Sequence, residues 1–63
     1  MNESDENIAA YGVAEAKAKM QAIKDHGLVL IDVITRLGTS RELSIAKTKV
    51  EEAVMWAVKH ITR

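Results

Sequence analysis

Small and apolar side chains recur along two stretches of this 63-residue chain, at spacings that alternate between three and four residues. The first stretch contains Ala16, Met20, Ile23, Gly27, Leu30, Ile34 and Leu37, and the second contains Leu43, Ala46, Val50, Ala53 and Ala57. Two packed helices share such a seam, because it keeps one stripe of each helix turned toward the other. The spacing predicts one helix over about residues 13–37 and a second over about residues 40–61.

Gly38 separates the two stretches and predicts a short turn at about residues 38–39. Glycine commonly follows the last residue of a helix because it tolerates a left-handed backbone. Thr39 stands three residues before Glu42, which is the spacing of a capping box at the start of a helix. A turn this short forces the two helices to run antiparallel. The sequence therefore predicts an all-α fold, with a short N-terminal arm or helix followed by an antiparallel two-helix hairpin.

The apolar content of the chain exceeds what a two-helix seam can cover. Apolar residues make up 48% of the sequence, and every residue from Val54 to Val58 is apolar. A chain this short buries little surface by itself, and without cysteine it has no disulfide to stabilise it. We therefore expect a helical homo-oligomer, in which Trp56 serves as an anchor between subunits in preference to stacking on a nucleotide base.

The charges of the chain cancel, with nine basic and nine acidic residues. No net field therefore attracts the protein to a DNA or RNA duplex or to an anionic membrane. Residues 1–10 are predicted to be a polar leader, without the basic start and apolar middle of a signal peptide, and residues 11–63 to be the hairpin domain. The longest apolar run, Leu28–Ile31, is too short to cross a bilayer. These features predict a cytosolic protein with no membrane partner.

Signatures of catalysis are absent from the sequence. It has no glycine-rich phosphate loop, no zinc-binding H-E-x-x-H motif and no nucleophile with an obvious base beside it. Asp25, His26 and Asp32 could in principle transfer protons, but the plainer interpretation is that they are solvated polar residues. We therefore expect a protein that is not an enzyme and that binds no metal or cofactor.

Two residues near the start of the hairpin are candidates for binding a nucleotide. Tyr11 lies beside Gly12 among small residues, and its ring could either stack on a purine or pack the arm against the hairpin. Lys24 follows the seam residue Ile23 and so lies at the edge of the packed face. Its ammonium group could reach a phosphate while its stem covers apolar surface, although an ordinary surface lysine would look the same in sequence.

A second candidate site consists of Arg41 and Thr48. Arg41 lies in the first turn of the second helix, where the partial positive charge of the helix disfavours a cation unless an anion binds there. Ser44 and Thr48 share its stripe of the helix, so a guanidinium and two hydroxyls could bind one phosphate together. The alternative is an ion pair between Arg41 and a carboxylate, either Asp32 or Glu42.

The second helix resembles the helical-hairpin domain of two phage counter-defence families. From Ser40 to Ala57 it matches the pattern S-R-E-x-S-x-A-x-T-K-x-E-E-A-x-M-W-A. One family sequesters the cyclic oligonucleotide messengers of CBASS immunity, and the other sequesters the cyclic ADP-ribose derivatives of Thoeris immunity. In the first helix, Met20–Gly27 followed by Leu30–Asp32 looks like the M-N-x-I-K-x-x-G…L-I-D pattern of the CBASS-messenger sponges.

This resemblance implies a compact helical homo-hexamer in the host cytoplasm that binds messengers without cleaving them. By motif match, Tyr11 would stack on a base of a cyclic dinucleotide such as cyclic GMP–AMP, and Lys24 would contact its phosphate. Arg41 would bind cyclic trinucleotides in a separate pocket, to which the stripe argument above adds Thr48.

Several alternatives to the hypothesis of a CBASS-messenger sponge stay open. The Thoeris-directed relatives carry more sequence before the hairpin than this chain has, which favours the CBASS messengers. A sponge for cyclic ADP-ribose-type messengers and a purely structural homo-oligomeric adaptor nevertheless remain alternatives. A messenger-degrading enzyme and a helix–turn–helix DNA-binding protein rank below both.

Overall fold

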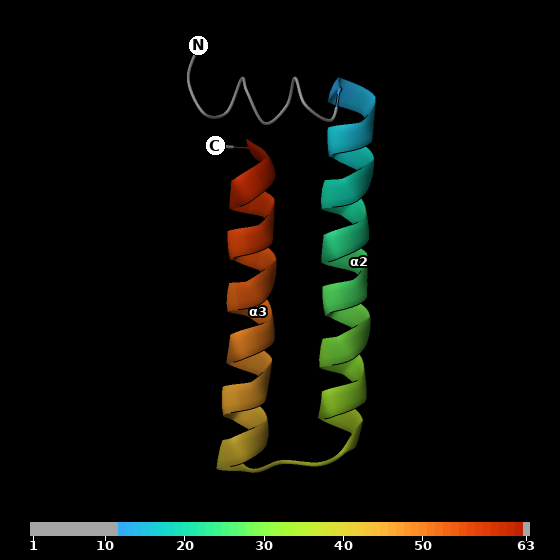
Figure 1. Ribbon diagram of the computed structural model, residues 1–63. Coiled ribbons are helices and arrows are strands. Elements are labelled where there is room, and N and C mark those ends of the chain that lie inside the picture. Colours follow the sequence, from blue (N-terminus) through green and yellow to red (C-terminus); the bar gives the residue numbers. More distant parts are fainter. Residues whose placement is uncertain (1–11, 63) are drawn as a thin grey trace.

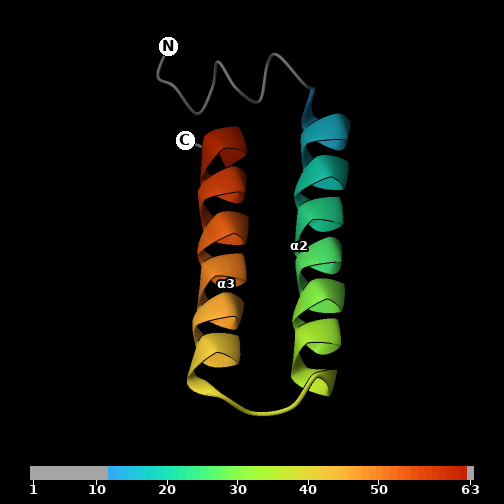
Figure 2. The same cartoon turned by 60° about the horizontal axis from the view of Figure 1, so that its bottom comes forward.

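The computed structural model describes residues 12–62, which form two long helices and, within that range, no strand. Helix α2 spans Val13–Arg36 and helix α3 spans Arg41–Thr62. The two helices run antiparallel and lie side by side along their length, as Figure 1 and the tilted view in Figure 2 both show. The predicted all-α class and its two helices are thereby confirmed, whereas the predicted leader and N-terminal arm lie outside the described residues.

Helix α2 ends in the way that the glycine after it predicts. Leu37 still has a helical backbone, and its N–H donates to the carbonyl oxygen of Ile34 at 3.0 Å. The N–H of Gly38 donates to the carbonyl oxygen of Thr35 at 3.3 Å. Gly38 itself has φ 130°, a backbone conformation that residues with a side chain rarely adopt. The chain therefore leaves the helix at this glycine.

The residue that caps α3 is Ser40, so the prediction that Thr39 forms a capping box with Glu42 is wrong. The hydroxyl oxygen of Ser40 accepts the backbone N–H of Leu43 at 3.1 Å, and its carbonyl oxygen accepts the N–H of Ser44 at 3.1 Å. The physical reason is distance. Packed helix axes lie about 8–10 Å apart, and a connection over residues 37–40 spans that separation more easily than one over 38–39.

The helices approach each other closely at Gly27 of α2 and Val54 of α3. A Cβ atom built on Gly27 would lie 2.5 Å from Cγ2 of Val54, well inside van der Waals contact. Gly27 is buried, and it shares that state with Ala16 and Ile61 among the described residues. The glycine of the seam thus admits the opposing helix, at a cost in helix propensity of about 1 kcal/mol relative to alanine.

Two positions of the predicted seam are displaced by one residue. Leu30 and Ala53 are exposed, and their neighbours Ile31 and Val54 are half-buried in the contact instead. A straight α-helix has 3.6 residues per turn, so a stripe that starts at spacings of three and four drifts around the helix with distance. The close approach at Gly27 determines which of two neighbouring residues on each helix faces the partner helix.

Much apolar surface remains uncovered on the hairpin. Nine large apolar side chains are exposed: Val13, Leu28, Val29, Leu30, Val33, Leu37, Ile45, Met55 and Trp56. Val58, in the same apolar run as Met55 and Trp56, is half-buried. Neither described helix is long and apolar enough to cross a membrane.

Candidate functional site

A groove with mixed character runs along one side of the contact between the helices. Its lining residues are Lys24, Gly27, Leu28, Ile31, Glu51 and Val54, and its volume is about 320 Å³. The two helices build it jointly. On α2, Lys24, Leu28 and Ile31 follow one another at spacings of four and three, which places them on one stripe. The groove combines apolar walls with one cation and one carboxylate.

Lys24 is exposed, and it forms no ion pair with any residue in the range 12–62. Three other basic side chains of the hairpin are engaged by carboxylates on their own helix. Lys19 pairs with Glu15 at 3.7 Å, Arg36 with Asp32 at 2.9 Å and Lys49 with Glu52 at 3.6 Å. The charge of Lys24 is thus available to a ligand, at the position beside the seam that the sequence indicated.

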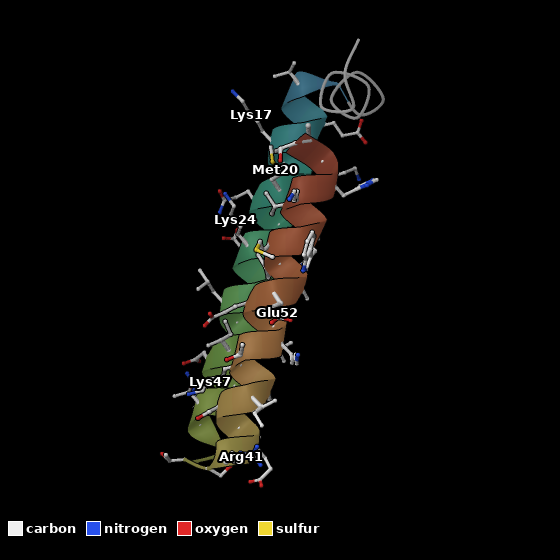
Figure 3. All side chains as sticks on the ribbon, turned by 90° about the vertical axis from the view of Figure 1, so that its left-hand side faces the viewer. Lys17, Met20, Lys24, Arg41, Lys47 and Glu52 are labelled. Carbon is white, nitrogen blue, oxygen red and sulfur yellow. The ribbon has the colours of Figure 1, made fainter. Side chains whose placement is uncertain are left out.

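Two more lysines project to the same side of the hairpin as Lys24. Figure 3 shows Lys17 and Lys24 on α2 and Lys47 on α3 pointing the same way. Together with Leu28 and Glu51 we call them the lysine face. These five residues carry three ammonium groups and one carboxylate, a local excess of positive charge on a chain that is neutral overall.

Glu51 is the residue of this groove that sequence reasoning assigned elsewhere. Helical spacing alone would allow it to pair with Lys47 across one turn, whereas the ion pair found on this part of α3 joins Lys49 to Glu52. Glu51 instead lines the groove opposite Lys24. The sequence pattern of one helix cannot predict that Glu51 lines the groove, because its place there depends on how α3 packs against α2.

The second candidate site lies at the turn end of the hairpin. Arg41 is the first residue of α3 and is exposed, and it makes no ion pair within the described part of the chain. The expected alternative partner Asp32 is bound to Arg36 instead. Thr48 is also exposed, but its hydroxyl donates to the carbonyl oxygen of Ser44 at 3.1 Å. Thr48 can therefore accept a hydrogen bond freely, and it must exchange this one to donate to a phosphate.

The structure does not bring the two candidate sites together within one hairpin. Arg36, next to the turn, lies twelve positions after Lys24 on α2, which at 1.5 Å per residue is roughly 18 Å. Figure 3 shows Arg41 at the turn end of the hairpin and Lys24 nearer the opposite end. Tyr11, the predicted base-stacking residue, lies outside the described residues. Joint action of Lys24 and Arg41 therefore requires either two ligands or two chains.

Potential metal ligands do not cluster in the described part of the protein. Residues 12–62 contain no group of three or more histidine, cysteine, aspartate or glutamate side chains placed to hold an ion. The histidines lie in different grooves. His26 and His60 line separate hollows on the side of the hairpin opposite the lysine face.

A comparison with protein families returns one match. The family model described as "Acb2/Tad1, hairpin domain" matches residues 1–62, so the match includes both helices and all four predicted site residues. Comparisons with curated proteins and with solved structures give no match.

Proposed function

The chain belongs to the Acb2/Tad1 hairpin family, the anti-CBASS and anti-Thoeris sponges, and on that premise we propose that it sequesters the cyclic oligonucleotide messengers of CBASS immunity without cleaving them. Membership by itself implies a sponge for cyclic nucleotide messengers. The proposal concerns which class of messenger is held and which residues hold it.

The groove beside Lys24 carries the proposal. A cyclic dinucleotide presents phosphates that need a cation and base faces that need apolar surface. The ammonium group of Lys24 would contact a phosphate, and Leu28 and Ile31 would lie against a base or ribose. Glu51 repels phosphate, and as an acceptor it suits the N–H groups on the edge of a purine. The ring of Tyr11 would stack on the base from outside, which is worth about 1–3 kcal/mol.

Assembly is part of the proposal. At about 320 Å³ the groove of one hairpin lies at the low end of the range of ligand pockets, roughly 300–1,000 Å³. A homo-hexamer would let neighbouring protomers close it over the ligand. The protein would act stoichiometrically in the cytoplasm of a phage-infected host, so that its capacity is set by copy number and affinity and not by turnover.

A second pocket for cyclic trinucleotides is proposed at Arg41, with Thr48 on the same helix. Arg41 lies where backbone N–H groups of α3 already favour an anion. Its guanidinium would bind a phosphate with two parallel hydrogen bonds. Because one hairpin supplies few groups here, several protomers would have to meet at this pocket.

Native mass spectrometry tests the proposal directly. The full chain is mixed with cyclic dinucleotides, cyclic trinucleotides and cyclic ADP-ribose isomers, and ligand is then recovered from the denatured protein. We expect intact cyclic nucleotides bound in small whole numbers per oligomer. Recovery of linear or hydrolysed nucleotide would contradict a sponge. Uptake of ADP-ribose isomers alone would indicate a sponge for Thoeris messengers instead. No uptake of any ligand would favour a structural adaptor.

A matched pair of lysine variants tests the site. Lys24→Ala removes a charge-assisted hydrogen bond of about 1.5–3 kcal/mol, which corresponds to roughly 10–150-fold weaker dinucleotide binding by calorimetry. Lys49→Ala is the control, because Lys49 pairs with Glu52 and does not line the groove. Equal losses of affinity in both variants would show that Lys24 is not part of the binding site.

A further inference from the structure

The lysines of the hairpin differ in whether a carboxylate neutralises them. Lys17, Lys24 and Lys47 lie on the lysine face, and none of them makes an ion pair within residues 12–62. Lys19 and Lys49 stand only two positions after Lys17 and Lys47, yet each is paired with a glutamate on its own helix. Three cations without a carboxylate partner are therefore gathered on one side of the molecule.

These three lysines follow one line along the hairpin. Lys24 comes seven positions after Lys17 on α2, which is two turns of helix and roughly 10 Å. Because the helices run antiparallel and Gly27 lies against Val54, Lys47 is level with a point ten positions after Lys24, roughly 15 Å further on. Figure 3 shows the three in this order from the open end toward the turn. The line is thus roughly 25 Å long.

Apolar side chains separate the cations of this line. Met20 lies between Lys17 and Lys24, as Figure 3 shows. Leu28, four positions after Lys24, lies between Lys24 and Lys47 and is 67% exposed. Charge and apolar surface therefore alternate along the lysine face.

We propose that the lysine face also binds a linear single-stranded oligonucleotide. Such a strand carries phosphates and bases in alternation, so its phosphates would meet the lysines while its bases lie against the apolar side chains. Glu51 lies across the groove from Lys24, at a level where this pattern requires a base, and its carboxylate can accept N–H groups from a base edge. The inference goes beyond the proposed function, which concerns cyclic messengers and uses Lys24 alone of the three lysines.

The length of the line favours an extended strand over other nucleotide ligands. A cyclic dinucleotide closes into a small ring and cannot reach from Lys17 to Lys47. A duplex keeps its bases stacked inside, so Met20 and Leu28 would have no base to contact. Only an unpaired, linear strand presents both groups along the whole line.

Lys47 is the contact that the fold prepares best. It is half-buried, whereas Lys17 and Lys24 are exposed. Its stem is thus partly covered by the hairpin while its ammonium group projects from the lysine face, as Figure 3 shows. A side chain that is already held loses less conformational entropy when it binds a ligand.

Charge, and not stacking, would hold the strand, because none of the five residues of the lysine face is aromatic. Binding should therefore weaken strongly as salt increases. Each lysine that neutralises a phosphate of a single strand contributes about −0.7 to the slope of log affinity against log salt, so three contacts predict a slope of about −2. A fourfold rise in salt should then weaken binding about 15–20-fold.

The test compares two double variants of the full chain that have the same net charge. Lys17→Ala with Lys47→Ala removes two cations of the line, and Lys19→Ala with Lys49→Ala removes two paired lysines outside it. Fluorescence anisotropy with a labelled single-stranded oligothymidine of about 12 nucleotides measures affinity at several salt concentrations. We expect the first variant to bind roughly tenfold more weakly, with a salt slope near about −0.7, and the second to behave as the wild type does.

Further variants separate charge from folding. Lys17→Arg with Lys47→Arg keeps both charges and should retain binding. Alanine favours helix at least as well as lysine, so circular dichroism should show unchanged helix content in both alanine variants.

Three results would overturn the inference: no binding of the strand to the wild type at low salt, equal losses in the two alanine variants, or equally tight binding of a duplex of the same length. Failure to take up cyclic messengers in native mass spectrometry would count against the proposed function and leave this result unaffected.

Discussion

The middle of the hairpin and its turn end are held by different kinds of contact. In the middle, Gly27 of α2 meets Val54 of α3, residues that lie far apart in sequence. At the turn, Gly38 and Ser40 act on backbone groups within four residues of themselves. Structure in the middle therefore depends on how the helices pair, whereas structure at the turn is largely local.

The two candidate ligand sites divide between these regions. The Lys24 groove is built from both helices, so its shape exists only while they are correctly paired. Arg41 and Thr48 both belong to α3 and keep their relative positions as long as that helix is intact. Changes to the helix contact should therefore weaken ligand binding at the Lys24 groove more than at Arg41. Changes at the turn should weaken binding at Arg41 more than at the Lys24 groove.

The largest effect is expected from Gly27→Leu. Even a Cβ atom at this position overlaps the side chain of Val54, so a leucine must push the helices apart. Overpacking of this kind lowers the free energy of unfolding by about 1–3 kcal/mol, and we expect a loss at the upper end of this range. Chemical denaturation at fixed protein concentration measures it. Dinucleotide binding at Lys24 should weaken with it.

Val54→Ala in the Gly27→Leu background is the control for this contact. Removing the two methyl groups of Val54 relieves the overlap, so the double variant should recover part of the lost stability. Unchanged stability in Gly27→Leu alone would show that the close approach of the two helices is not important for the fold.

A comparable effect, on binding and not on stability, is expected from Arg41→Ala. Loss of the guanidinium removes about 1.5–3 kcal/mol of charge-assisted hydrogen bonding to a cyclic trinucleotide and should leave dinucleotide affinity unchanged. Isothermal titration with each ligand measures both. Arg36→Ala is the matched control at the same end of the hairpin, because Arg36 is already paired with Asp32. Equal loss of both ligands in Arg41→Ala would mean that Arg41 supports the assembly.

The smallest effect is expected at the cap of α3. Ser40→Ala removes the acceptor for the N–H of Leu43 and should lower stability by about 1 kcal/mol. Ser40→Asp should retain most of it, since aspartate caps as well as serine. Thr39→Ala should change stability little. A larger loss of stability in Thr39→Ala than in Ser40→Ala would support the capping box that the sequence suggested.

Local rules predicted those parts of the fold that local contacts determine. Gly38 was identified as the end of the first helix because its backbone conformation is needed whatever lies nearby. Thr39 and Ser40 are both good caps, however, and only the span between the helices decides between them. Similarly, Leu30 and Ile31 are both apolar, and the close approach at Gly27 determines which of them faces α3.

The candidate site was predictable to a similar degree. Lys24 follows a seam residue, so its place at the edge of the contact follows from helical spacing alone. Glu51 follows Lys49 and precedes Glu52 in sequence, which gives no sign of the groove, because its position opposite Lys24 is a property of the pairing of the helices. The apolar excess of the chain indicated that apolar surface stays uncovered, but which face carries it depends on both helices being in place.

The small number of buried residues has a consequence for how much working protein a cell contains. Among the described residues only Ala16, Gly27 and Ile61 are buried, so a single hairpin has little to hold it folded. If copies associate as proposed above, folding and assembly become one equilibrium, and the folded fraction rises with total concentration. Below a threshold of synthesis the chains would be largely unfolded and exposed to proteases. Above it, each added chain would contribute fully, so binding capacity would rise more steeply than expression.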